Sequence, residues 1–181
     1  CWSANYRLHY RRVTLMLKNQ TCCCIGPTFV QANAQMNLNM WMDSTITRLY
    51  QDYHIRYFGI GGNRGFELAV ANTILLKRAR LLDCKIILVA PCPEFADRWR
   101  DKDKSLYVKV KGSANKVVSV SPYYIPDCMR LRNKHLIDNS SVLICMEDKP
   151  GTETSLAIQY ARESGLEVFC FRGSHSPNSF S

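Results

Sequence analysis

The sequence predicts a doubly wound α/β fold, in which a mostly parallel sheet carries helices on both of its faces. Short β-rich runs alternate with helical patterns along nearly the whole chain. Most of these runs are apolar at consecutive positions, which is typical of strands that are buried on both faces of a parallel sheet. A chain of 181 residues is long enough for one domain with a substantial core and too short for two comfortable ones.

Six short runs are expected to be the strands of this sheet. The central ones, such as KIILVA and VLICM, contain almost no polar residue, and the first places three cysteines in a row. In chain order the expected strands are Thr21 to Ile25, Ile55 to Ile60, Lys85 to Ala90, Lys116 to Val120, Val142 to Met146 and Glu167 to Phe171.

Five helices are expected between the strands. Met42, Ile46 and Leu49 share one face of the first, and Pro126 suits the first position of the fourth. A Pro-Gly turn opens the last helix and Gly165 ends it. The expected helices are Trp41 to Tyr53, Phe66 to Leu82, Asp101 to Ala114, Pro126 to about Ile137 and Thr152 to Ser164.

The domain is expected to span residues 21–171. Residues 1–20 are interpreted as a loosely ordered N-terminal extension, because the apolar part from Val13 to Leu17 is too short for a signal peptide. Residues 172–181 are polar and are expected to form a flexible tail. No apolar run approaches the roughly 20 residues that a membrane-spanning helix needs.

Charge and cysteine content narrow the expected partners and location. The formal net charge is +9, which favours phosphorylated ligands or nucleic acid as partners, although a basic surface with no specific role is the alternative. The nine cysteines include no CxxC pair, and neighbours in Cys22-Cys23-Cys24 point to opposite faces of a strand. Buried, reduced thiols are therefore expected, which indicates a cytoplasmic protein. The four histidines are scattered, so neither a metal site nor a cofactor is expected.

The most distinctive turn is IGGNRGFE, from Ile60 to Glu67. It lies between an expected strand and an expected helix, where free N–H groups and the helix dipole favour an anion. Arg64 adds a positive charge for a phosphate. Its glycines match neither GxGxxG nor a Walker A loop. The alternative is a tight connection with an exposed arginine.

Two further turns also precede helices. From Asp148 to Ser155, a Pro-Gly turn is followed by Thr152 and Thr154, whose hydroxyls can cap a helix or donate to a phosphate. From Asp127 to His135, four basic or potentially basic side chains surround a helix, which by itself favours a solvated basic face. In a doubly wound sheet, ligands bind beyond the carboxyl ends of the strands, where these turns lie.

With these turns in view, the chain resembles the SLOG superfamily, the Rossmann-like fold that unites DprA-type and LOG-type proteins, and especially its YpsA-like bacterial branch. Three ordered motifs carry the resemblance: the loop from Ile60 to Glu67, the segment CMRLRN with Asp138, and Pro150-Gly151-Thr152 with the helix that ends in Tyr160-Ala161. PCPEFADRW and VSPYYIPDCM also resemble that branch.

The resemblance covers roughly Thr21 to Phe171, with several departures from the family pattern. Ile25-Gly26-Pro27-Thr28 stands where the branch has a TGHR-like turn, and Glu67 replaces an aspartate. The last loop has one glycine where two are typical. Residues 27–40 fit the family poorly.

The resemblance implies a nucleotide or nucleotide-derived ligand across the two glycine loops and a sensor or regulatory role. Arg64 and Arg132 would then pair with phosphates, while glycine backbone and the Thr152 hydroxyl cradle them. Glu67 would contact a ribose hydroxyl or brace its loop. The expected ligand-binding residues are Gly61, Gly62, Arg64, Gly65, Glu67, Arg132, Asn133, Gly151 and Thr152.

Two alternatives remain open. LOG enzymes hydrolyse nucleoside monophosphates with an arginine that matches Arg132 and a glutamate whose position is Ser155 here. A glycosidase needs a carboxylate, and Glu153 lies about 200° round the helix from that position, which argues against LOG-type hydrolysis. Single-stranded DNA binding in the manner of DprA is the other alternative. A homo-oligomer is an open expectation as well.

Overall fold

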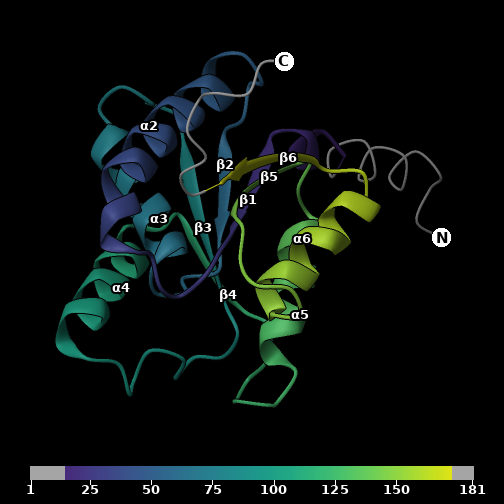
Figure 1. Cartoon of the computed structure of the whole chain (residues 1–181). Coiled ribbons are helices and arrows are strands. Elements are labelled where there is room, and N and C mark those ends of the chain that lie inside the picture. Colours follow the sequence, from purple (N-terminus) through teal and green to yellow (C-terminus); the bar gives the residue numbers. More distant parts are fainter. Residues whose placement is uncertain (1–14, 173–181) are drawn as a thin grey trace, which may run out of the picture.

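Six parallel strands form the centre of the molecule. The computed structural model describes residues 15–172, so the expectations for residues 1–14 and 173–181 lie outside the described part. The strand order is β4-β3-β2-β1-β5-β6, which confirms the predicted fold class (Figure 1). The strands are β1 (Thr21–Ile25), β2 (Tyr57–Ile60), β3 (Lys85–Ala90), β4 (Lys116–Ser119), β5 (Val142–Met146) and β6 (Glu167–Phe171).

Helices cover both faces of this sheet. The chain moves outward from β1 to β4 and then returns to place β5 on the other side of β1. Because such crossovers are right-handed, α2, α3 and α4 lie on one face and α5 and α6 on the other (Figure 1). The helices are α2 (Gln35–Gln51), α3 (Phe66–Lys77), α4 (Asp101–Ser113), α5 (Cys128–Asp138) and α6 (Glu153–Glu163), with a short 3-10 turn η1 (Ala32–Ala34).

The bounds of β1, β3, β5 and β6 agree with the sequence prediction, whereas β2 begins two residues late. Ile55 is fully buried, but its N–H donates to the carbonyl of Leu49 in α2 rather than to a strand. Only from Tyr57 onward does the backbone pair with β1 and β3. The apolar side chain of Ile55 therefore looked like part of the strand in the sequence, although its backbone does not pair there.

Two helix boundaries differ more. Helix α2 begins at Gln35 rather than Trp41, because the polar positions of its first turns face outward while Leu38 is buried. Helix α3 ends at Lys77 rather than Leu82. Beyond it, the chain turns into β3 through hydrogen bonds from the N–H groups of Arg80 and Leu81 to the carbonyl of Lys77.

The cysteine triplet is confirmed as buried, free thiols. Cys22 and Cys24 belong to the core between the sheet and α2, α3 and α4, whereas Cys23 belongs to the core under α5 and α6. All three are fully buried. Strand β1 is thus enclosed on both faces, as its position at the middle of the sheet requires.

Residues 15–172 contain neither a membrane-spanning helix nor a cluster of metal-ligating side chains. Within residues 15–172, no helix combines the length and the apolar character that crossing a membrane requires. The same residues bring together no group of three or more His, Cys, Asp or Glu side chains suited to a metal ion.

Candidate functional site

The loop between β2 and α3 is held in place by its own helix and by the turn after β1. The carboxylate of Glu67 accepts a hydrogen bond from the N–H of Asn63 at 2.9 Å. The N–H of Phe66 donates to the carbonyl of Pro27 at 3.1 Å. Gly65 has a φ of 73°, and an added Cβ would lie 2.6 Å from the carbonyl group of Thr28, so only glycine fits there.

Beneath this loop, Arg132 of α5 meets Glu67 of α3 in a buried ion pair. The Arg132 side chain is 1% exposed and that of Glu67 0%. Arg132 Nη2 lies 3.3 Å from Glu67 Oε1 and donates to Asn133 Oδ1 at 2.7 Å, while Nη1 donates to the Gly61 carbonyl at 3.2 Å. The guanidinium therefore joins α3, α5 and the glycine loop.

The charge state of this pair reflects opposing effects. Burial raises the pKa of Glu67 above its usual value, while the charge of Arg132 and the N–H groups of Asn63 and Gly26 act to lower it. The Arg132 guanidinium and the Glu67 carboxylate thus face each other inside the protein.

Gly61 is required by the same cluster. A Cβ at this position would lie 2.6 Å from the guanidinium carbon of Arg132 and 2.6 Å from Glu67 Oε2. Real side chains do not approach so closely, so any other residue would push the ion pair apart. The first glycine of the loop thus makes room for the Arg132–Glu67 pair.

Arg64 points elsewhere. It is exposed, and its guanidinium carbon lies 5.5 Å from the centroid of the Trp99 ring. Gly62, two residues before Arg64, packs against Leu88 and the Tyr107 ring. Arg64 is therefore placed over the aromatic cluster of the β3–α4 connection, apart from the buried Arg132.

The turn between β5 and α6 is held by hydrogen bonds from the side chains at the start of α6. Thr152 Oγ1 accepts a hydrogen bond from the N–H of Ser155 at 3.2 Å and donates to the carbonyl of Lys149 at 3.0 Å. Thr152 is thus the N-cap of α6. Ser155 Oγ donates to the Thr152 carbonyl at 2.9 Å, so this serine also belongs to the cap.

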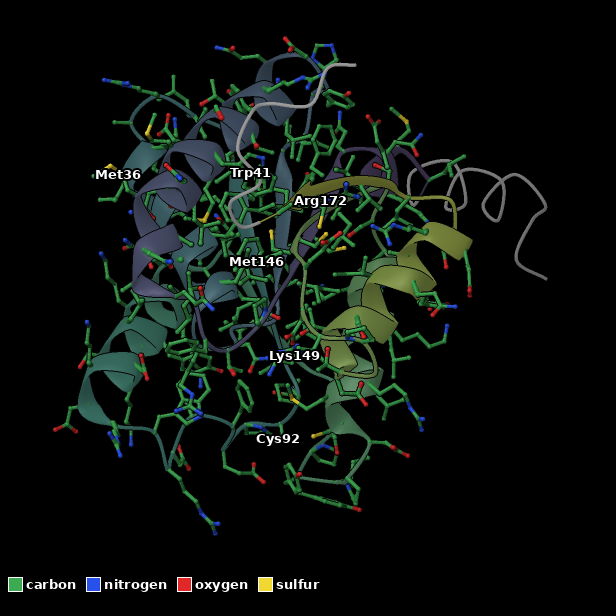
Figure 2. All side chains as sticks on the ribbon, viewed as in Figure 1. Met36, Trp41, Cys92, Met146, Lys149 and Arg172 are labelled. Atoms are coloured by element: carbon green, nitrogen blue, oxygen red, sulfur yellow. The ribbon has the colours of Figure 1, made fainter. Side chains whose placement is uncertain are left out.

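A groove of about 850 Å³ opens beside this turn, between the carboxyl ends of β1 and β5. Its walls come from the β1–α2 connection and the β5–α6 turn. Figure 2 labels Met146 and Lys149 near the middle of the molecule and Met36 on the outer side of α2, where it is exposed. The lining residues include Thr28, Phe29, Gln31, Asn33, Asn37, Glu147, Asp148, Lys149 and Phe171.

This groove lies where the strand order reverses. Strands β2, β3 and β4 follow on one side of β1, and β5 and β6 lie on the other. In doubly wound sheets the crevice at this point is the usual ligand site. None of the nine residues expected to bind the ligand lines it, because strand order cannot be read from local patterns.

The groove has both polar and apolar lining and carries both signs of charge. Glu147 Oε1 accepts a hydrogen bond from Arg172 Nε at 3.1 Å, at the rim where Figure 2 labels Arg172. Asp148 Oδ1 accepts from the N–H of Lys149 at 2.8 Å. The carboxylates and amides of the lining suit hydroxyl groups, and Lys149 suits an anion.

The predicted site residues therefore fall into three places. Gly61, Glu67, Arg132 and Asn133 meet in the buried cluster, with Gly62 and Gly65 in the loop above it. Arg64 lies over Trp99. Gly151 and Thr152 lie at the start of α6, beside the groove, where Gly151 has a φ of 82°.

Comparison with known proteins places these motifs in a family. A sequence profile for the YpsA group, described as the YspA SLOG family, matches residues 28–167. The chain belongs to this SLOG family. The matched region begins in the turn after β1 and ends at the first residue of β6, so it contains both glycine loops and the buried ion pair.

Two curated relatives carry the name UPF0398 protein. The one from Enterococcus faecalis is 27% identical over 106 residues, which is 56% of this chain and 59% of the relative. The one from Halalkalibacterium halodurans is 28% identical over 102 residues, 54% of each. The chain therefore matches less than two thirds of the length of these relatives.

Solved structures of DprA share the fold. The DNA processing protein A of Streptococcus pneumoniae superposes with a TM-score of 0.64 at 16% identity, over 88% of this chain and 52% of that protein. The Helicobacter pylori protein gives a TM-score of 0.60 at 13% identity, over 84% of this chain and 65% of its own. At this identity the likeness shows the SLOG fold alone.

Within this SLOG domain, two motif residues form a clasp between α5 and α6. The Tyr160 hydroxyl donates to Asp138 Oδ1 at 2.8 Å, and Lys134 Nζ donates to Asp138 Oδ2 at 2.8 Å and to the Tyr160 oxygen at 2.7 Å. The aspartate of the CMRLRN segment and the tyrosine near the end of α6 thus act together. Their shared role is to pack the two helices on the same face of the sheet.

Proposed function

We propose that this SLOG domain binds a nucleotide or nucleotide-derived ligand in the groove between β1 and β5, and acts as a sensor or regulator. The observation that carries the proposal is the groove itself, of about 850 Å³, at the reversal of strand order. Its volume lies within the range of roughly 300–1,000 Å³ that small-molecule sites occupy.

The lining supports a ligand with a phosphate end and a hydroxyl-rich end. Lys149 provides positive charge for a phosphate in the groove, and the N-terminus of α6 opens on the adjoining pocket, which shares Glu147 and Asp148 with the groove. Asn33, Asn37 and Asp148 offer acceptors and donors for ribose hydroxyls. Phe29 and Phe171 add apolar area for a base.

The buried ion pair changes the role proposed for Arg132 and Glu67. Both are positioning residues that hold the glycine loop and the turn after β1. The ligand contacts are assigned instead to the groove residues together with Gly151 and Thr152. Arg64 remains a candidate for a phosphate that extends toward Trp99.

Catalysis is not part of this proposal. Ser155, at the position of the LOG glutamate, uses its hydroxyl to bond the Thr152 carbonyl. Glu153 lines the separate cleft between α5 and α6. Base release from nucleoside monophosphates at high enzyme concentration, measured beside the binding experiments, tests the hydrolase alternative directly.

Calorimetric titration of AMP, GMP, ADP and ADP-ribose tests the binding proposal. Two variants address the groove without touching the buried cluster. Lys149→Ala removes the charge, and we expect it to weaken binding by about tenfold, or about 1.4 kcal/mol. Asn37→Trp fills the groove and is expected to abolish binding.

Matched controls separate the groove from general effects. Lys111→Ala makes the same charge change near the end of α4, and Met36→Trp adds the same ring on the outward side of α2, where Met36 is 74% exposed. Both are expected to bind as the wild type does. No binding of any nucleotide to the wild type, or equal binding by Asn37→Trp and Met36→Trp, would refute the proposal.

A second candidate function, binding of single-stranded nucleic acid, is favoured by the loop between β4 and α5. Tyr123 and Tyr124 are 64% and 65% exposed there, and Arg130 follows in the first turn of α5. Exposed aromatic rings beside basic side chains are the means by which single strands are bound without sequence preference. The Helicobacter pylori DprA is described as binding single-stranded DNA.

Fluorescence anisotropy with an oligo-dT probe tests this second candidate. Binding should fall steeply with salt, and the double variant Tyr123→Ala, Tyr124→Ala should lose most of it. Leu82→Ala, at another exposed apolar position, serves as the control. Equal affinity of the tyrosine variant and the control, or no binding even at low salt, would rule the candidate out.

A further inference from the structure

Cys170 differs from the other described cysteines in its exposure. Of the eight free cysteines that the structure describes, seven are buried and Cys170 is half-buried. It lies on β6, which is the edge strand of the sheet. A thiol on an edge strand can meet a small oxidant that does not reach the buried cysteines.

Cys145 of β5 is the direct neighbour of Cys170. The two residues are paired in the parallel register of β5 and β6. Both belong to the core under α5 and α6, so their side chains leave the sheet on the same face. Paired residues of neighbouring strands lie about 4.7–4.9 Å apart, within the Cα separation of about 4.4–6.8 Å that a disulfide spans.

The surroundings give the two thiols different roles. A hydrogen bond from Cys145 lowers the pKa of Cys170, and the charges of Arg162 and Arg172 act in the same direction, against partial burial and Glu147. The hydrogen bond to Cys170 and burial raise the pKa of Cys145. Cys170 is also the more exposed of the two thiols, so it is the one that an oxidant meets first, and its thiolate is the nucleophilic form.

We propose that Cys170 and Cys145 form a peroxide-reactive dithiol site, in which Cys170 is oxidised first and Cys145 closes a reversible disulfide. The Cys170 sulfur attacks one oxygen of hydrogen peroxide, the O–O bond breaks, and the leaving hydroxide takes a proton to become water. The Cys145 sulfur then attacks the sulfenic acid and displaces its hydroxyl as a second water. Two thiols are oxidised and one peroxide is reduced.

This site lies next to the groove but on the other side of the sheet. The residues that follow the two cysteines, Met146 and Phe171, line the groove, and beyond them Glu147 pairs with Arg172. A disulfide would therefore join the two strands just before they enter the groove wall. The proposal is independent of what the groove binds.

Peptide mapping of the full chain tests the proposal. Trypsin places Cys145 in the peptide from His135 to Arg162 and Cys170 in the peptide from Glu163 to Arg172, each with no other cysteine. After hydrogen peroxide and alkylation of remaining thiols, we expect these two peptides to appear linked, and dithiothreitol to separate them. If both peptides stay alkylated as free thiols, or either links to a different cysteine, the proposal fails.

Variants resolve the order of the two steps. Cys170→Ser should leave Cys145 alkylated as a free thiol, whereas Cys145→Ser should leave Cys170 as a sulfenic acid that dimedone traps. Cys84→Ser, at a buried cysteine outside the pair, should still form the linked peptides. Cys145→Ala repeats the test if the serine variant does not fold, and dimedone labelling of Cys145 in Cys170→Ser would reverse the assigned order.

Discussion

Arg132 on α5 and Glu67 on α3 form an ion pair that is closed off from solvent and tied to the carbonyl of Gly61. The pair joins helices on opposite faces of the sheet at its carboxyl edge. Two motifs that lie 65 residues apart in the chain are thereby held in one cluster. The cluster sets the shape of the glycine loop without taking part in the groove.

Removing one partner of this ion pair should lower the free energy of unfolding more than replacing both partners. Arg132→Met leaves the Glu67 carboxylate buried and unpaired, so we expect the free energy of unfolding to fall by about 3–5 kcal/mol. The double variant Arg132→Met, Glu67→Leu should recover most of that loss, because no buried charge remains. Urea denaturation of the wild type and the two variants measures both changes. A loss below about 1 kcal/mol in the single variant would contradict a buried ion pair.

Gly61→Ala and Gly112→Ala should act in opposite directions. The new Cβ at position 61 would lie 2.6 Å from both the Arg132 guanidinium and the Glu67 carboxylate, and we expect a loss of about 1–3 kcal/mol. Gly112 lies in α4 with nothing within 4 Å of the added Cβ, so alanine should be neutral or stabilising by up to about 1 kcal/mol. Thermal denaturation compares the two variants. Equal melting temperatures would contradict the close approach at Gly61.

Tyr107→Phe should be neutral or stabilising. The Tyr107 hydroxyl is buried, has no hydrogen-bond partner within residues 15–172, and burial raises its pKa. Removing an unsatisfied hydroxyl relieves a desolvation cost of about 1–3 kcal/mol. Tyr53→Phe is the control, since the Tyr53 hydroxyl donates to Glu167 at 2.8 Å and its loss brings no such gain. A marked destabilisation by Tyr107→Phe in urea would mean that this hydroxyl is satisfied in solution.

The clasp between α5 and α6 should depend on pH. Partial burial of Asp138 opposes ionisation, but hydrogen bonds from Lys134 and Tyr160 outweigh it, so its pKa lies below the usual value. A lowered carboxyl pKa gives stability that is present above the unfolded-state value of about 4 and is lost as the pH falls through the folded-state value. The Asp138→Asn variant should therefore be slightly less stable than the wild type at pH 7, by about 0.2–1 kcal/mol because the pair is exposed.

The difference in free energy of unfolding between the wild type and Asp138→Asn should vanish in acid. Urea denaturation at pH 7 and near pH 3 measures it, and Asp97→Asn, at an exposed carboxylate outside any helix, controls for the change in net charge. A difference that persists unchanged at the lower pH would show that the clasp does not depend on the ionised carboxylate.

Local pattern was enough to predict β1, β3, β5 and β6 with their observed bounds. These strands are short, apolar at nearly every position and separated by turn residues, so the signal needs no knowledge of neighbours. The start of α2 could not be found in this way. Its first turns are polar, Ala34 offers no side-chain cap, and only the burial of Leu38 against the sheet reveals the helix.

The candidate site was predictable only as far as it depends on local pattern. The sequence by itself determined the SLOG fold class, the two glycine turns and the position of Arg132, because turns, caps and motif spacing are local properties. Only the tertiary structure decided that Arg132 faces Glu67 and that the groove opens between β1 and β5. Those two facts depend on which helices and strands become neighbours, and adjacency across 65 residues of chain arises from packing, not from local pattern.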